Sequence, residues 1–357
     1  MAGSSFGTIF RITTWGESHG AGIGCVVDGA PAGYSLCADD IQKYLNRRKP
    51  GSSKFSTPRK EADRVEILSG VFDGKTTGTP ISLLIRNENQ ISKDYSDLAD
   101  KYRPGHADFG YDIKYGFRDY RGGGRSSGRE TAGRVAGGAV AALILKELGI
   151  SFLTYAKQIG PVTCDPDRFD ASFIGENELG MPDREAYAQA AAFLNECRTQ
   201  TDSAGGIAEC IISGVPAGLG DPVFEKLDAN LAKAIFSIGA VKGFEIGSGF
   251  EAALKKGSEN NDPFGTDAEG KITTLTNHCG GILGGISTGG DIIMRAAFKP
   301  TPSIARPQQT TDAAGNPVTL SIHGRHDPII VPRALVVIEC MAACVILDAL
   351  LMNRSAR

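Results

Sequence analysis

The amino-acid sequence predicts an α+β fold built on antiparallel sheets. Its candidate strands occur in hairpin pairs as often as they are separated by helices, a pattern that disfavours a doubly wound parallel sheet. Glycine accounts for 46 of the 357 residues and is interleaved with apolar strands, which indicates many tight turns rather than disorder. We expect one domain over residues 1–357, with an insertion at about residues 150–205 where the signal for regular structure is weak.

Short runs of β-branched and aromatic residues, bounded by turn residues, mark the strands. Two strands flank a turn at residues 16–20, and the next two flank a turn at residues 73–78. The candidate strands after the first pair are residues 65–72, 80–85, 207–212, 241–246 and 292–299.

Five segments have the features of helices. Ala38, Asp39 and Asp40 open the first, and Ser127 can cap the second. The third is rich in alanine, and Pro222 stands near the first position of the fourth, where proline is favoured. The predicted helices are residues 38–46, 127–148, 183–199, 221–238 and 332–351, the last of them strongly apolar.

Composition excludes several classes of protein. A net charge of −3 shows that the chain as a whole is not built to bind polyanions, so any attraction for anions must be local. The eight cysteines are scattered without a CxxC pair, which favours reduced thiols and a cytoplasmic location. We find no signal peptide and no apolar run long enough to span a membrane, so no membrane association is expected.

Residues 118–134, RDYRGGGRSSGRETAGR, contain five arginines and five glycines directly before an apolar helix. Ser127 and Glu130, three residues apart, form a potential capping box. A glycine-rich loop that leads into a helix offers free N–H groups and the positive end of the helix dipole. The segment therefore favours a phosphate or carboxylate site, although a flexible loop before a basic helix remains an alternative.

Residues 47–64 form a basic loop with seven Lys or Arg against two acids. Such runs are usually solvated, and nucleic-acid contact is an alternative. Phe55 is its single aromatic residue, so the loop offers no platform on which bases could stack, and no nucleic-acid partner is expected.

Two nucleotide-binding patterns match poorly. Residues 70–76, GVFDGKT, are one residue short of a P-loop, and the following TGTP cannot open the required helix. Residues 247–252, GSGFEA, match the dinucleotide fingerprint GxGxxA but lack a surrounding βαβ unit. This second match leaves a nicotinamide-dependent oxidoreductase as an alternative function.

Two histidines lie in polar turns that contain glycine. His19 stands in GESHG and His106 in RPGHAD, where charged neighbours can set a tautomer or a pKa as acid–base catalysis requires. Asp327 follows Arg325 and His326 just before the last helix. His323, His326 and Asp327 have no second cluster at metal-ligand spacing, so no metal site is expected.

Three long motifs in the same order closely resemble the chorismate synthase family. They are GESHGAGIGCVVDGAP at residues 16–31, GRSSGRETAGRVAGGAV at 124–140 and GRHDPIIVPRALVVIECMA at 324–342. Shorter stretches agree as well, including RRKPG at 47–51, YRPGHADF at 102–109 and NHCGGILGGISTG at 277–289. The resemblance covers almost the whole chain.

The resemblance implies a carbon–oxygen lyase that acts on phosphates (EC 4.2.3.5) in the last step of the shikimate pathway. Such an enzyme forms chorismate from 5-O-(1-carboxyvinyl)-3-phosphoshikimate by 1,4-anti elimination of phosphate, using reduced FMN without net redox change. It also implies a β-α-β sandwich, in which antiparallel sheets enclose long helices, and a homotetramer. NADPH is a possible reductant of the flavin.

Residue by residue, the resemblance implies the following roles. His19 would protonate the leaving phosphate, His106 would keep the reduced flavin correctly protonated, and Asp327 would help flavin N5 accept the substrate proton. Arg48 and Lys54 would meet substrate or a nicotinamide phosphate. FMN would be bound by Arg125, Ser126, Ser127, Gly239, Ala240, Gly284, Lys299, Pro300, Thr301, Pro302, Ser303 and Arg325.

Three of these positions depart from the common family pattern. Lys54 replaces an arginine, which keeps the charge but loses the bidentate fork. Gly239 replaces an asparagine, so only its backbone can contact a ligand. Pro302 replaces a serine and removes a hydroxyl.

Overall fold

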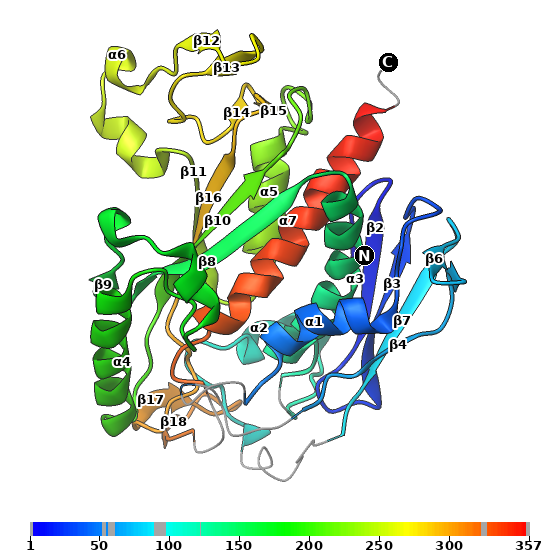
Figure 1. Cartoon of the computed structure of the whole chain (residues 1–357). Coiled ribbons are helices and arrows are strands. Elements are labelled where there is room, and N and C mark those ends of the chain that lie inside the picture. Colours follow the sequence, from blue (N-terminus) through cyan, green and yellow to red (C-terminus); the bar gives the residue numbers. More distant parts are fainter. Residues whose placement is uncertain are drawn as a thin grey trace.

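The computed structural model describes residues 3–51, 55, 61–88, 98–121, 123–322 and 327–354. Two five-stranded sheets lie on opposite sides of two long helices, α3 (Thr131–Glu147) and α7 (Val331–Asn353) (Figure 1). The strands that pair within the described chain do so antiparallel. The predicted α+β sandwich is therefore confirmed.

The first sheet has the order β1-β2-β3-β7-β4 and packs on α3. Its strands are β1 (Ser5–Phe6), β2 (Arg11–Gly16), β3 (Gly22–Asp28), β7 (Ile81–Arg86) and β4 (Val65–Ile67). The second sheet has the order β11-β16-β10-β8-β9 and packs on α7. Its strands are β11 (Val241–Ile246), β16 (Ile292–Phe298), β10 (Gly206–Ser213), β8 (Ser151–Ile159) and β9 (Val162–Thr163).

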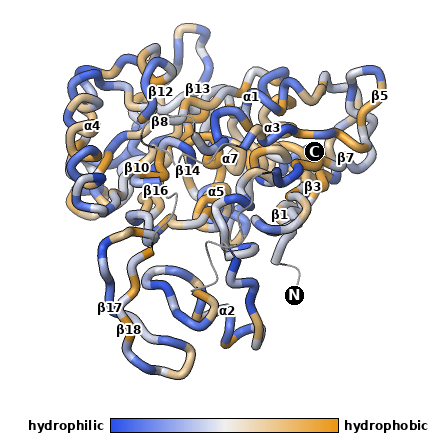
Figure 2. The backbone as a smooth tube through the Cα atoms, turned by 90° about the horizontal axis from the view of Figure 1, so that it is seen from below, coloured by the Kyte–Doolittle hydropathy of each residue, from blue (hydrophilic) through white to orange (hydrophobic). Residues whose placement is uncertain are grey.

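Shorter elements surround this sandwich. The other helices are α1 (Ala38–Arg48), α2 (Asp108–Tyr115), α4 (Arg184–Thr199), α5 (Leu227–Phe236), α6 (Gly257–Asn260) and the 3₁₀ turns η2 (Gly124–Ser126), η3 (Gly128–Glu130), η4 (Pro166–Arg168), η5 (Ala171–Gly175) and η6 (Gly249–Leu254). The small hairpins are β5–β6 (Val71–Phe72, Lys75–Thr76), β12–β13 (Phe264–Thr266, Ile272–Thr274), β14–β15 (Ile282–Leu283, Ile286–Ser287) and β17–β18 (Gln308–Thr311, Pro317–Leu320). The hairpin β17–β18 and α2 project from the sandwich and mix hydrophilic with hydrophobic residues (Figure 2).

Glycines allow α3 to approach both of its neighbours closely. A Cβ at Gly137 would come within 2.6 Å of Cys25 Sγ on β3, and one at Gly138 within 2.5 Å of the Cys340 carbonyl oxygen on α7. Both distances are shorter than real Cβ contacts, so larger residues would separate the elements. The small residues in TAGRVAGGAV thus set the spacing of the central layer.

The C-terminal helix α7 is buried almost all round, as expected of an apolar helix between two layers. It is long and apolar enough to cross a membrane, which corrects the sequence-based statement that no such run exists. Of its most apolar window, 83% is buried inside the protein, the position of a core helix.

Most predicted elements are confirmed, with two corrections at helix starts. The predicted helix at 221–238 begins only at Leu227, because residues 221–225 close a turn and the Leu227 N–H donates to Gly285. Ser127 accepts from the Arg129 N–H and opens η3, but Glu130 does not complete a capping box. Its carboxylate instead accepts from Thr14 Oγ1 and Arg134 Nε.

Two further sequence interpretations concern β8 and the GSGFEA pattern. Residues 151–159 form β8, which pairs with β10 inside the second sheet, so the start of the 150–205 segment belongs to the sandwich. Whether the remainder is an insertion stays a prediction. The GSGFEA pattern follows β11 but lies mostly in the 3₁₀ turn η6, beside an antiparallel strand. It lacks the helix that a dinucleotide site requires.

Candidate active site

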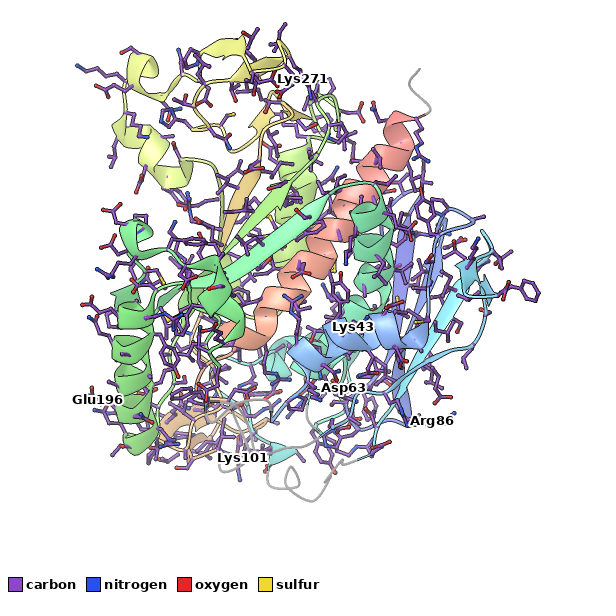
Figure 3. The ribbon with its side chains drawn as sticks, in the orientation of Figure 1. Lys43, Asp63, Arg86, Lys101, Glu196 and Lys271 are labelled. Carbon is purple, nitrogen blue, oxygen red and sulfur yellow. The ribbon has the colours of Figure 1, made fainter. Side chains whose placement is uncertain are left out.

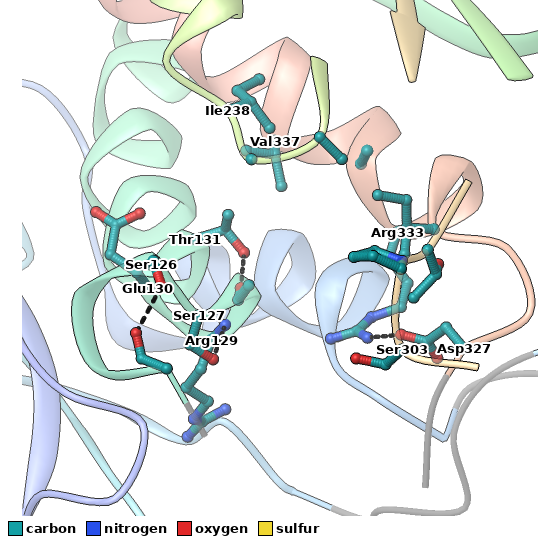
Figure 4. A pocket seen from close by; sticks show the side chains of 18 of the residues that line it. Ser126, Ser127, Arg129, Glu130, Thr131, Ile238, Ser303, Asp327, Arg333 and Val337 are labelled. Atoms are coloured by element: carbon teal, nitrogen blue, oxygen red, sulfur yellow. Dashed lines mark hydrogen bonds and ion pairs between the residues drawn. The ribbon is translucent and has the colours of Figure 1, made fainter. Parts of the chain in front are cut away.

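A cavity of about 590 Å³ lies where the N-terminal ends of α3 and α7 meet. Figure 4 shows Ser126 to Thr131 on one side and Ser303, Asp327 and Arg333 on the other. The charged side chains that line it are Arg48, Arg103, Arg125, Arg129, Arg134, Arg333, Lys299, Glu130 and Asp327. Seven cations against two carboxylates give the wall a positive potential suited to an anionic ligand.

Asp63 holds two of these arginines together. Arg48 donates to its Oδ2 through Nε and Nη2, and Arg129 donates to its Oδ1 through Nη1. Burial alone would raise the pKa of Asp63, but the two guanidinium groups outweigh it and the pKa is lowered. Figure 3 shows Asp63 below α1, which ends in Arg48. The residue has a φ of 48°, in the left-handed region that aspartate tolerates better than most residues.

Arg129 is fixed on a second side by Asn87, whose Oδ1 accepts from its Nε at 3.0 Å. The remaining terminal nitrogen, Nη2, lies 3.4 Å from Glu61 Oε2 but makes no hydrogen bond within the described chain. Nη2 therefore faces a carboxylate in an ion pair and keeps hydrogen-bonding capacity for a further acceptor.

Arg333, in the first turn of α7, joins Asp327 to the end of α1. Its Nη1 donates to Asp327 Oδ2, and its Nε donates to the Arg48 carbonyl oxygen at 3.0 Å. Burial lowers the pKa of Arg48 to about 10, with Asp63 acting in the opposite direction and Arg333 and Arg129 adding to the lowering. The positive charges of these arginines therefore repel one another, and an anion bound between them would reduce that repulsion.

Glu130 organises the other wall of the cavity. It accepts from Arg134 Nε at 2.7 Å and lies 3.6 Å from Arg125 Nη2. The Arg125 guanidinium also donates to the carbonyl oxygens of Gly16 and Thr14. Arg125 thus ties the glycine loop to the end of β2 before any ligand binds.

His106 has both ring nitrogens engaged. Nδ1 lies 3.0 Å from the Pro104 carbonyl oxygen, which can only accept, so Nδ1 carries the hydrogen. Nε2 therefore accepts from Ser303 Oγ, 2.9 Å away. Burial, aided by Arg103, lowers the pKa of His106 to about 4, so the ring is neutral near pH 7.

Two contacts, one buried and one exposed, steady the surroundings of this histidine. Arg103 forms a bidentate pair with Asp108 at 2.7 Å, and Lys299 donates to the Gly105 carbonyl oxygen at 2.6 Å. Ala240 accepts from the Lys299 N–H while its own φ is 72°, an unfavourable conformation for alanine. Strained backbone beside a cavity is typical of a functional site.

The cavity brings together most of the residues singled out from the sequence. Those on its wall are Arg48, His106, Arg125, Ser126, Ser127, Gly239, Ala240, Lys299, Thr301, Pro302, Ser303 and Asp327. Pro300 is not on the wall, although its neighbours are. Lys54 and Arg325 lie outside the described residues.

His19 and Gly284 do not line this cavity in the described structure. His19 is buried in the turn between β2 and β3, where Ser18 Oγ lies 3.2 Å from its Nδ1. Gly284 is exposed on the β14–β15 hairpin, at the opposite end of the molecule from α2 (Figure 1).

Sequence reasoning did not assign a site role to Asp63, Asn87, Arg103, Arg134 or Arg333. Three of them stood within quoted motifs: Arg103 in residues 102–109, Arg134 in residues 124–140 and Arg333 in residues 324–342. Asp63 and Asn87 are isolated polar residues next to strands. No spacing rule marks such residues, because their partners are distant in sequence.

Comparison with known proteins gives a consistent result. The family model described as chorismate synthase matches residues 10–351. Chorismate synthases of Agathobacter rectalis and Lachnoclostridium phytofermentans are each 64% identical over 357 residues, covering 100% of this chain and 97% of theirs. A crystal structure of chorismate synthase superposes with a TM-score of 0.76 at 33% identity, covering 98% of this chain and 93% of that chain.

Proposed function

Because the chain belongs to the chorismate synthase family, we propose that the arginine-lined cavity is its active site. The activity of the family is a lyase reaction, the last step of the shikimate pathway. The substrate, 5-O-(1-carboxyvinyl)-3-phosphoshikimate, carries one phosphate and two carboxylates. The observation that supports this site is the excess of guanidinium groups on one wall, held in place by Asp63 and Glu130.

The three anionic groups of the substrate could contact arginines in three regions around the cavity. Arg48 and Arg129 share one carboxylate, Arg125 and Arg134 share another, and Arg333 pairs with Asp327. Each region is partly neutralised in the free protein, which limits repulsion between the arginines. The phosphate and the two carboxylates of the substrate would meet the positive charge that remains.

Reduced FMN fits the remaining wall of the cavity. Thr301 Oγ1 is buried there without a hydrogen-bond partner among the described residues, and Ala240 presents strained backbone beside it. Ser126, Ser127, Gly239, Lys299 and Ser303 would contact the flavin with these two residues. When bound, reduced FMN would supply electron density that assists loss of the allylic phosphate without net redox change.

The three acid–base candidates have different tasks in the proposal. His106 is neutral, and with Nδ1 on Pro104 and Nε2 on Ser303 it is suited to holding a fixed hydrogen-bond pattern rather than to donating a proton. Asp327, oriented by Arg333 on the cavity wall, would help flavin N5 accept the proton that the elimination removes. His19 would protonate the leaving phosphate.

Other parts of the proposal rest on family resemblance. Arg48 and Lys54 would contact substrate or a nicotinamide phosphate, with NADPH as a possible reductant of the flavin. Gly284 and Arg325 would complete the FMN contacts. The active form would be a cytoplasmic homotetramer.

An anaerobic assay tests the reaction directly. Protein with photoreduced FMN and substrate should release phosphate and form chorismate, with no net flavin oxidation. Repeating the assay with NADPH and oxidised FMN would show whether the chain reduces its own flavin. Absence of phosphate release under photoreduction would refute the proposal.

A further inference from the structure

Asn87 connects the turn that carries His19 to the arginines of the cavity. Its side-chain Nδ2 donates to the carbonyl oxygens of Glu17 and Gly20, both at 2.9 Å. Its Oδ1 accepts from Arg129 Nε at 3.0 Å. The residue directly follows β7, and its backbone N–H donates to the Ala21 carbonyl oxygen at 3.2 Å.

The chemistry of these partners leaves one orientation for the amide. The Nε group of Arg129 can only donate, and the two backbone carbonyls can only accept. Both N–H groups and the oxygen of Asn87 are therefore used, without ambiguity between its oxygen and nitrogen. An aspartate at this position would keep the contact with Arg129 but lose both donors.

This contact adds to the backbone hydrogen bonds of the turn itself. Within it, the Gly20 N–H donates to the Glu17 carbonyl oxygen at 3.1 Å, and the flanking strands resume pairing at Gly16 and Ile23. Asn87 holds the carbonyl oxygens at both ends of the segment that contains His19. The backbone of the segment that carries His19 is therefore anchored to Asn87 at both ends.

The same amide fixes the position of the turn relative to the cavity. Arg129 lines the cavity, and its guanidinium is bound on one side by Asn87 and on the other by Asp63. Asp63 in turn binds Arg48, whose carbonyl oxygen accepts from Arg333. A continuous chain of hydrogen bonds therefore runs from the His19 turn to Asp327.

We propose that Asn87 is a positioning residue for the reaction: it holds the turn of His19 at a fixed distance from the anion-binding arginines. The inference rests on the proposed role of His19 as the acid for the leaving phosphate. A proton donor must stay within hydrogen-bond reach of its acceptor, and a displacement of about 1 Å can cost roughly 100-fold in rate. Asn87 itself does not touch the reacting atoms.

The test compares Asn87→Asp with a matched control, Asn177→Asp. Asn177 also donates to two backbone carbonyls, those of Phe173 and Met181, but it lies near η5, outside the cavity. We expect Asn87→Asp to lower kcat about 10- to 100-fold, with KM changed less than about 3-fold because Arg129 keeps its acceptor. Asn177→Asp should change kcat less than about 2-fold.

A double-mutant cycle with His19→Ala separates positioning from general damage. If Asn87 acts through His19, the Asn87→Asp loss in kcat should shrink to less than about 2-fold in the His19→Ala background. Hydrogen exchange measured on the peptide containing residues 17–20 should also become faster in Asn87→Asp and stay unchanged in Asn177→Asp.

The outcomes distinguish the two proposals. Equal kcat losses in both backgrounds, or a loss no greater than that of Asn177→Asp, would overturn the positioning role while His19 remains the acid. Wild-type turnover in His19→Ala would instead overturn the acid assignment, and the role of Asn87 with it.

Discussion

Asp63 accepts hydrogen bonds from both Nε and Nη2 of Arg48, although neither side chain is more than 1% exposed. A buried pair of this kind contributes little net stability compared with apolar residues, yet removing one member leaves a charge without its partner. At Asp63 the loss would affect two arginines at once.

We therefore expect Asp63→Asn to lower the free energy of unfolding by about 3–5 kcal/mol. Asparagine tolerates the left-handed backbone at this position, so the effect would report the charge. Asp73→Asn is the control, because Asp73 has nearly the same φ, 49°, but is exposed in the β5–β6 turn. In urea unfolding, Asp73→Asn should change the free energy of unfolding by less than about 0.5 kcal/mol. Equal losses of stability in the two variants would contradict the prediction.

The low pKa of His106 makes stability depend on pH in one window. The pKa is about 4 in the folded protein against 6.5 ordinarily. Between these values the unfolded chain binds a proton that the folded chain does not, so the free energy of unfolding falls as pH decreases from 6.5 to 4. The shift lowers the free energy of unfolding by about 3 kcal/mol in total at low pH, and above pH 7 it has no effect on stability.

His106→Gln should remove this dependence. Urea unfolding of the wild type and the variant at pH 7.5, 6, 5 and 4 gives the free energy of unfolding as a function of pH. The two curves should separate as pH falls from 6.5 to 4, because the wild type loses more stability on acidification. Parallel curves over this range would show that His106 is not held neutral.

Arg125 should stabilise the fold as well as any bound flavin. Its guanidinium donates to the carbonyl oxygens of Gly16 and Thr14 and to Thr14 Oγ1, so Arg125→Ala should lower the free energy of unfolding by about 1–3 kcal/mol without FMN. Arg11→Ala is the control, because Arg11 lies on β2, the strand that Arg125 contacts, and the Arg11–Asp28 pair is about half exposed.

Flavin titration measures the second effect of Arg125→Ala. We expect weaker FMN binding in Arg125→Ala and unchanged binding in Arg11→Ala. An unaltered FMN affinity in Arg125→Ala would remove this residue from the proposed cofactor contacts.

Two helical glycines should respond oppositely to alanine. At Gly138 a Cβ would come within 2.5 Å of both the Cβ and the carbonyl oxygen of Cys340, so Gly138→Ala should force α3 and α7 apart and lower the thermal midpoint by several degrees. At Gly110 in α2 nothing lies within 4 Å, so Gly110→Ala should be neutral or stabilise by up to about 1 kcal/mol. Differential scanning calorimetry of both variants checks the prediction; a neutral Gly138→Ala would refute the tight crossing.

Sequence patterns located the elements well where local periodicity is strong. The strand at 241–246 and the helix at 332–351 agree with β11 and α7 within two residues. The helix at 221–238 was placed too early, because Pro222 satisfies the helix-start pattern while the contact between Leu227 and Gly285 decides where the helix begins. Ser127 caps the 3₁₀ turn η3 rather than α3, which begins at Thr131, and Glu130 accepts from Thr14, a partner 116 residues away.

The sequence by itself determined the antiparallel α+β class and membership of a family that its motifs resemble, and it predicted an anion site at residues 118–134. These follow from local composition, turn chemistry and motif spacing, all of which are written along the chain. Only the tertiary structure decided that Asp63 joins Arg48 to Arg129, and that Asn87 joins the His19 turn to the same cluster. Such contacts depend on how α1, α3 and the strands pack, and a single polar residue leaves no periodic signal of the partner that packing brings to it.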